Sequence, residues 1–194
     1  NIQINECSFS RKDWAGLYVE NESKATIEKC VFQENVLSAN IAGNAVMNET
    51  KILRQLQSNQ SIPSLQVSGG VLECNDCQLH NNNLGCLVCD NGKLVSYQTE
   101  FKDNKIHLEV TRHADSSFNK CNFINSTGDY SLRISDDANA VIDNCEVTGC
   151  NNAGIVVEAG ATITNSIIKD AKTIGVLCSG TSTKLIKNNE IVKN

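Results

Sequence analysis

ATIEKCVFQEN, residues 25–35, places an apolar residue three positions before Cys30 and another two positions after it. The same arrangement returns in IQINECSFSRK at residues 2–12, SSFNKCNFINS at residues 116–126 and AVIDNCEVTGC at residues 140–150. A motif that returns at a steady spacing marks a repeat protein, so the period has to be established before any secondary structure is assigned.

The position of Cys30 defines an anchor column that runs through the whole chain. Successive members lie 21–25 residues apart, and they are Cys7, Cys30, Gln55, Cys77, Thr99, Cys121, Cys145, Ser166 and Asn189. All five phenylalanines stand either three positions before an anchor or two positions after one. The interval between Cys30 and Gln55 is the least regular and can be aligned in more than one way.

A second apolar pair follows each anchor by about ten residues, with one residue between its two members. The pairs are Leu17/Val19, Leu65/Val67, Leu87/Cys89, Leu108/Val110, Leu132/Ile134, Ile155/Val157 and Val176/Cys178. Alternation of this kind predicts a strand that buries one face. One repeat cannot bury its own apolar residues, so the repeats must stack on one another. The leucine-rich pattern, which has a similar period, is absent.

These repeats predict an all-β parallel β-helix, a solenoid of about eight coils of 21–25 residues, built as one domain over residues 1–194. GIVVEAGATITNSIIKDAKTIGVLCSGTSTKLIKNNEIVKN, residues 154–194, resembles the coils of right-handed parallel β-helix proteins with the pectate-lyase-like architecture. The resemblance implies three strands per coil and an asparagine ladder in a tight turn, which Asn144, Asn165 and Asn188, with Asp76, match in part. The cysteine-rich coils are similar to those of intracellular, non-catalytic members, such as the β-helix domains of F-box and spindle-associated adaptors.

The ten cysteines allow three interpretations. Most of them occupy repeat positions, where a free cysteine packs as a small apolar residue. Cys74, Cys77, Cys86 and Cys89 form two C-x-x-C pairs and could instead bind zinc. Stacked cysteines such as Cys121 and Cys145 could form disulfides.

Composition restricts the partners and the compartment. A net charge of −5 and a pI near 5.2 disfavour nucleic acid, and no apolar run is long enough to span a membrane. Sequons at Asn21, Asn48, Asn59 and Asn125 would suit secretion. The thiol-rich core favours an intracellular, cytoplasmic protein, with secretion left open. Strand motifs stand at both ends of the chain, so we expect it to be part of a longer protein or to pair end to end.

The outward residues of one strand in each coil are the candidate functional positions, because catalytic relatives of this fold use that face. The candidate binding residues are Tyr18, Gln66, Val88, His107, Glu109, Arg133, Val156, Glu158 and Leu177. If the protein is an enzyme, Asp90, Glu109, Arg133 and Glu158 are the candidate catalytic residues, and only then is calcium expected. No nucleophile elbow, P-loop or H-E-x-x-H motif occurs.

The sequence therefore favours a non-catalytic scaffold that presents an elongated sheet face to a protein or a glycan, with no cofactor. The alternative is a polysaccharide lyase or a glycoside hydrolase.

Overall fold

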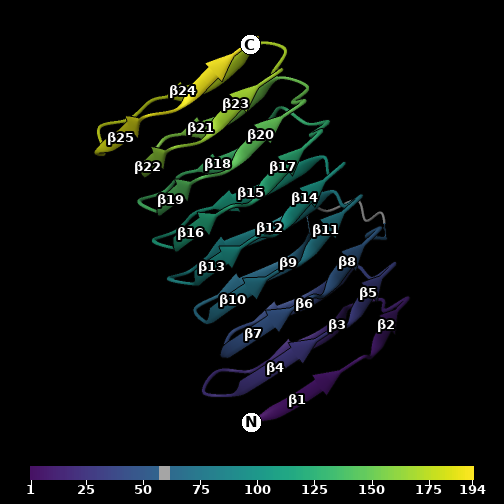
Figure 1. Ribbon diagram of the computed structural model, residues 1–194. Helices are drawn as coiled ribbons and strands as arrows, with labels where there is room; N and C mark the ends of the chain where they lie inside the picture. Colours follow the sequence, from purple (N-terminus) through teal and green to yellow (C-terminus); the bar gives the residue numbers. More distant parts are fainter. Residues whose placement is uncertain (57–61) are drawn as a thin grey trace.

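The chain winds through three parallel sheets and visits each sheet once per coil (Figure 1). The computed structural model describes residues 1–56 and 62–194, so the sequon at Asn59 lies outside the described residues. The predicted all-β solenoid is confirmed, and each strand pairs residue for residue with its counterpart one coil away.

The first two sheets contain nine strands each. Sheet A consists of β1 (Ile2–Asn5), β4 (Lys24–Glu28), β7 (Asn44–Asn48), β10 (Val71–Asn75), β13 (Lys93–Tyr97), β16 (Asp115–Asn119), β19 (Asn139–Asp143), β22 (Gly160–Thr164) and β25 (Lys184–Lys187). Sheet B consists of β2 (Ser8–Ser10), β5 (Val31–Gln33), β8 (Lys51–Leu53), β11 (Gln78–His80), β14 (Glu100–Lys102), β17 (Asn122–Ile124), β20 (Glu146–Thr148), β23 (Ile167–Lys169) and β26 (Glu190–Val192).

The third sheet contains eight strands and closes each coil. Sheet C consists of β3 (Ala15–Val19), β6 (Leu37–Ile41), β9 (Pro63–Ser68), β12 (Leu84–Cys89), β15 (Ile106–Val110), β18 (Tyr130–Ile134), β21 (Ala153–Val157) and β24 (Ile174–Cys178).

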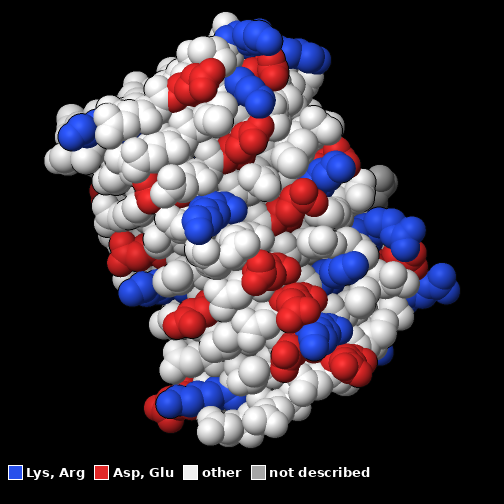
Figure 2. Space-filling model, viewed as in Figure 1, with Lys and Arg blue, Asp and Glu red and all other residues white. Residues whose placement is uncertain are grey.

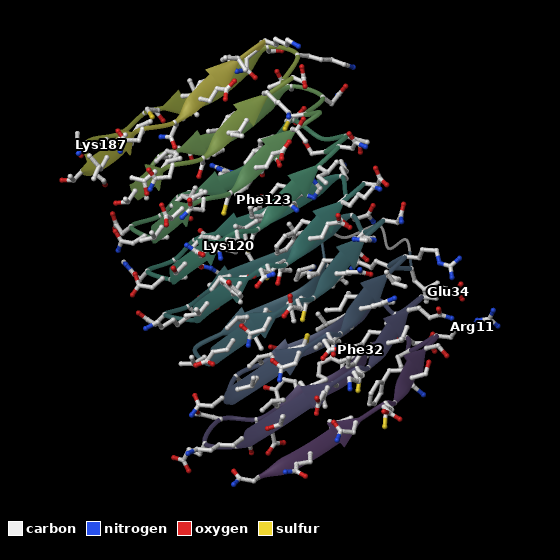
Figure 3. All side chains as sticks on the ribbon, in the orientation of Figure 1. Arg11, Phe32, Glu34, Lys120, Phe123 and Lys187 are labelled. Atoms are coloured by element: carbon white, nitrogen blue, oxygen red, sulfur yellow. The ribbon has the colours of Figure 1, made fainter. Side chains whose placement is uncertain are left out.

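Apolar columns fill the interior between the sheets. Phe32 stacks on Phe9 with ring centroids 4.6 Å apart, and Phe101 stacks on Phe123 at 4.8 Å. Phe32 and Phe123 lie inside the coil, whereas Arg11 and Glu34 form an ion pair outside it (Figure 3). Stacking like side chains on adjacent rungs is the sheet counterpart of core packing, and aromatic pairs of this kind stabilise beyond their buried area.

The tight corner between sheets A and B has one residue in the left-handed region in every coil. The φ angles range from 47° to 58°, and the residues are Glu6, Lys29, Glu49, Asp76, Gln98, Lys120, Asn144, Asn165 and Asn188. Such a conformation is uncommon outside glycine, so its return in nine coils identifies it as a constant of the fold.

The predicted register is wrong in the third coil. Lys51–Leu53 pairs with Val31–Gln33, which makes Thr50 and not Gln55 the neighbour of Cys30 in the anchor column. Thr50 Oγ1 accepts a hydrogen bond of 3.3 Å from the Cys30 amide. Gln55 lies in the next corner, between sheets B and C. The prediction assumed that the repeats before and after this anchor have similar lengths. The later repeat is the longer one, because additional residues follow Gln55.

The asparagine ladder lies at the corner between sheets B and C, and not at the predicted positions. Asn82 Oδ1 accepts the Gln55 amide at 3.1 Å, and Asn104 Oδ1 accepts the Asn82 amide at 2.8 Å. Both side chains are buried and donate to backbone carbonyls of the preceding coil. Asn144, Asn165, Asn188 and Asp76 instead hold the exposed left-handed position.

We predict that Asn82→Ala lowers the free energy of unfolding by about 1–3 kcal/mol, because it leaves the buried Gln55 amide without its acceptor. Chemical denaturation measures this loss. Asn122→Ala, an exposed change on sheet B, is the control and should cost less than about 0.5 kcal/mol. Equal losses in the two variants would contradict a specific role for the ladder.

Candidate functional site

The outer face of sheet C carries one side chain from each coil in a continuous column. The strand register gives the order Tyr18, Asn40, Gln66, Leu87, Glu109, Arg133, Val156 and Leu177. The structure thus places six predicted binding residues in one column on one face, namely Tyr18, Gln66, Glu109, Arg133, Val156 and Leu177.

Val88 does not lie on this face. It is fully buried and pairs with Val67 and Val110, while Leu87 points outward in its place. The alternating inward residues of β12 are therefore Cys86 and Val88 and not Leu87, whereas Cys89 at the end of the strand is buried as predicted. The prediction was one residue out because every candidate in LGCLVC is apolar, and because the corner before sheet C varies in length between coils.

His107 also lies in the core and not on the outer face. Its column otherwise holds small residues, such as Gly85 and Ser131, and a Cβ on Gly85 would lie 2.7 Å from the His107 carbonyl. The residues at this position and at the next one, such as His107 and Leu108, are both buried in the sheet C strands from β6 to β21. Strict alternation fails there, and this local irregularity escaped the sequence prediction.

Burial keeps the His107 ring neutral. Desolvation lowers its pKa to about 3, and the ring lies between Phe101 and Phe123, with centroid distances of 6.5 and 6.2 Å. Asn104 Nδ2 lies 2.9 Å from His107 Nδ1. Because an amide nitrogen can only donate, Nδ1 is the acceptor and the ring proton is on Nε2. His107 therefore links the asparagine ladder to the aromatic core.

Three of the four candidate catalytic residues gather on sheet C around a residue that the sequence analysis missed, Tyr130. The Tyr130 hydroxyl donates to the Glu109 carboxylate, and the Arg133 guanidinium lies 5.9 Å from the Tyr130 ring centroid. Arg133 donates from Nε and Nη2 to Glu158 Oε2, at 2.9 and 2.7 Å. The only sequence signal for Tyr130 was an aromatic residue at the start of the strand that carries Arg133.

Asp90 belongs to a different group of contacts. It follows β12 at the corner between sheets C and A, where Ser68 Oγ donates to it at 3.2 Å and Arg112 Nε lies 3.4 Å away. The four predicted catalytic residues therefore divide into a cluster of three, in which Glu109 and Arg133 lie on strands and Glu158 follows β21, and a separate residue, Asp90.

Tyr130 and Arg133 are both held in their protonated forms. Burial and the hydrogen bond to Glu109 raise the pKa of Tyr130 to about 12, so it stays protonated at neutral pH. The hydrogen bond to Glu158 raises the pKa of Arg133. A general base works best with a pKa near the operating pH, and neither group provides one.

The cysteines line the core as free thiols. Eight of the ten are buried, and only Cys7 and Cys178 are exposed. Cys74 lies on β10, Cys77 follows that strand, and Cys86 and Cys89 lie on β12. Burial raises the pKa of the Cys86 thiol, which disfavours the thiolate that a metal ion needs. Within residues 1–56 and 62–194, no three His, Cys, Asp or Glu side chains are grouped to bind a metal ion.

Exposed apolar side chains stand at both ends of the sheet C face. Trp14, the only tryptophan, is 68% exposed and stacks on Tyr18, which is 45% exposed, with ring centroids 6.1 Å apart. Leu177 and Ile174 are exposed at the other end. Trp14 precedes β3 and was not predicted, because it stands in a corner outside the repeating columns.

Residues 107–194 match the family model described as the right handed beta helix region. The matched segment begins in β15 and continues through the remaining coils, whose sheet register is that of the preceding ones. The chain has the fold of a right-handed parallel β-helix. No curated protein matches it. Among the described residues of this β-helix, none form a helix long and apolar enough to cross a membrane.

We predict that His107 makes the β-helix sensitive to acid. An ordinary histidine pKa is 6.5, and the folded value is about 3, so the neutral ring favours the folded state above pH 6.5. That stabilisation is lost as the pH falls from 6.5 towards 3, because the unfolded chain binds the proton first. The difference in unfolding free energy between wild type and His107→Gln should change by up to about 1.4 kcal/mol per pH unit in this window.

Denaturant titrations at several pH values measure this difference. His113→Asn removes an exposed histidine and is the control, which should follow the wild-type profile. A His107→Gln profile parallel to that of the wild type would contradict the prediction.

Proposed function

We propose that this β-helix is a non-catalytic interaction module that binds a protein partner through the outer face of sheet C. The observation that carries the proposal is the stacked and exposed Trp14–Tyr18 pair. Large aromatic residues dominate the energetics of protein interfaces, and an exposed tryptophan leaves most of its apolar surface in contact with water in the isolated fold.

The rest of the face has the composition of a binding surface. Arginine and tyrosine are the other residue types enriched at interface hot spots, and Arg133 and Tyr130 lie together near the middle of the column. The contacts with Glu109 and Glu158 hold both side chains in place, so little conformational entropy remains to be lost on binding. Leu177 supplies an apolar contact at the far end.

A reduced, intracellular compartment fits this proposal. All ten cysteines are free in the structure, and a column of buried thiols is packed without any bridge. Disulfides form readily in oxidising compartments, so a protein that keeps ten free thiols is better suited to the cytoplasm.

The alternative is a polysaccharide lyase or a glycoside hydrolase, and one observation favours it. Glu109, Arg133 and Glu158 lie on one face with Tyr130, and carboxylates beside an arginine can act on acidic or neutral glycans. Calcium is required only by the lyase version of this alternative. A glycan could also bind without being cleaved, with the Trp14 and Tyr18 rings providing a stacking platform.

We predict that Trp14→Ala weakens binding of the partner by about thirtyfold, the effect of losing roughly 2 kcal/mol at an interface hot spot. Affinity capture from cell extract, followed by quantitative mass spectrometry and titration of the captured protein, measures it. Leu177→Asp should also weaken binding, whereas Val192→Asp, a similar change on sheet B, should not. A partner retained equally by all variants would contradict the use of this face.

We predict no turnover of acidic or neutral polysaccharides, with or without calcium, because Tyr130 and Arg133 stay protonated at neutral pH and engage Glu109 and Glu158 in hydrogen bonds. Reducing-end and unsaturated-product assays measure turnover. Cleavage that Arg133→Ala abolishes and Val192→Asp preserves would establish the enzymatic alternative.

A further inference from the structure

The outer face of sheet A has a period of two coils. Its central outward column begins with Gln3 on β1, and from β4 onward it alternates between polar and aliphatic residues on successive strands, in the order Thr26, Val46, Glu73, Val95, Ser117, Val141, Thr162 and Leu185. The aliphatic residues therefore stand about 9.6 Å apart, since adjacent strands are separated by about 4.8 Å. Val95, Val141 and Leu185 are 37–49% exposed, although the interior has ample apolar positions.

Two hollows lie along this column. One of about 470 Å³ lies over β1, β4, β7 and β10, and its lining includes Thr26, Val46 and Glu73. The other, of about 330 Å³, lies between Val141 and Leu185 and has Gly160 and Thr162 among its lining residues. The hollows therefore lie towards the two ends of the column, and aliphatic residues of the column are among the residues that line them.

We propose that this face binds a second copy of the same chain, turned end for end. A second copy has the same two-coil period, so the aliphatic residues towards one end of its column can enter the hollow at the opposite end of the first copy. A two-fold axis parallel to the strands, between β13 and β16, brings β13 opposite β16 of the second copy. It likewise brings β10 opposite β19, β7 opposite β22, and β4 opposite β25. Every aliphatic residue of the column then meets a polar residue across the interface.

In this arrangement, opposite charges from the two flanking outward columns face each other across the interface. The same axis places Glu28 opposite Lys187 of the second copy, and Lys93 opposite Asp115 of the second copy. No like charges face each other across the interface in these columns. Asn75 faces Asp143 of the second copy, which places an uncharged amide opposite a carboxylate. None of Glu28, Lys93, Asp115 and Lys187 forms an ion pair within the described parts of the chain.

The area and the shape also fit. Eight strands of five residues cover about 600 Å² on each copy, given strand spacings of about 4.8 Å and rises of about 3.3 Å per residue. The total of about 1,200 Å² is the lower limit for a specific interface, so the dimer should be reversible.

Face-to-face sheets cross at an angle that arises from their own twist. The sheet A strands run nearly parallel along the stack, which keeps the two columns in register (Figure 1). Basic and acidic side chains are interspersed over the visible surface, and no large patch of a single charge opposes self-association (Figure 2).

A charge exchange tests the proposal and its register. Glu28 and Lys187 lie seven strands apart in sheet A, so they can meet only between copies. We expect Glu28→Lys to raise the dimer dissociation constant at least about tenfold, Lys187→Glu to do the same, and the double variant to return within about threefold of wild type. Sedimentation velocity over a range of concentrations measures the constant. Glu190→Lys, which makes the same charge change on sheet B, should leave it unchanged.

A wild type that stays monomeric up to about 0.5 mM would overturn the proposal. A dimer that Trp14→Ala disrupts and Glu28→Lys does not would place the contact on sheet C and would also overturn it. Circular dichroism confirms that each variant is folded. Small-angle scattering provides a second measurement, because a side-by-side dimer keeps nearly the length of the monomer and an end-to-end dimer doubles it.

Discussion

The residue-for-residue pairing of each coil with the next is the constraint on which the rest of this structure depends. Because the register is direct, a side chain at one position always lies above its counterpart in the neighbouring coil, and columns of like character follow. A single coil has neither enough hydrogen bonds nor enough buried area to fold alone, so the interior forms only through stacking. The left-handed corner residue and the buried asparagine ladder serve the same end, since they keep the coils equal in shape where sequence length varies.

The features that this constraint makes periodic could be predicted from the sequence. The phenylalanine columns, the anchor cysteines and the parallel order of the coils all follow from a single repeating period. The prediction was wrong where a corner departs from that period. Because additional residues follow Gln55, the anchor position is Thr50 and not Gln55. Because the corner before Leu84 is shorter, Leu87 and not Val88 lies on the outer face. In a run of apolar residues the sequence does not show which alternate residues face inward, because either choice buries hydrophobic side chains.

The candidate site was predictable only in part, for a related reason. Residues in the outward column of sheet C could be placed once the strand was known, and Glu109 and Arg133 were placed correctly on that face. Their chemistry depends on neighbours from outside the column. Tyr130 begins its strand at a position that holds aliphatic residues in neighbouring coils, and Trp14 precedes a strand, so the repeat indicated neither of them. His107 was misplaced because two successive residues turn inward at the start of the strand, and alternation alone predicts the opposite orientation.

The three-sided coil gives this β-helix independent surfaces on one rigid support. Sheet C combines exposed aromatic residues with a paired arginine, and it lacks symmetry along its length, which suits a partner of a different kind. Sheet A has a regular two-coil alternation with balanced charges, which suits an identical copy. Because the two sheets are separate faces of the coil, a dimer formed through sheet A leaves sheet C uncovered in both copies. The two sheet C faces then belong to one particle, and a partner with repeated binding segments would be held more tightly than by either face alone.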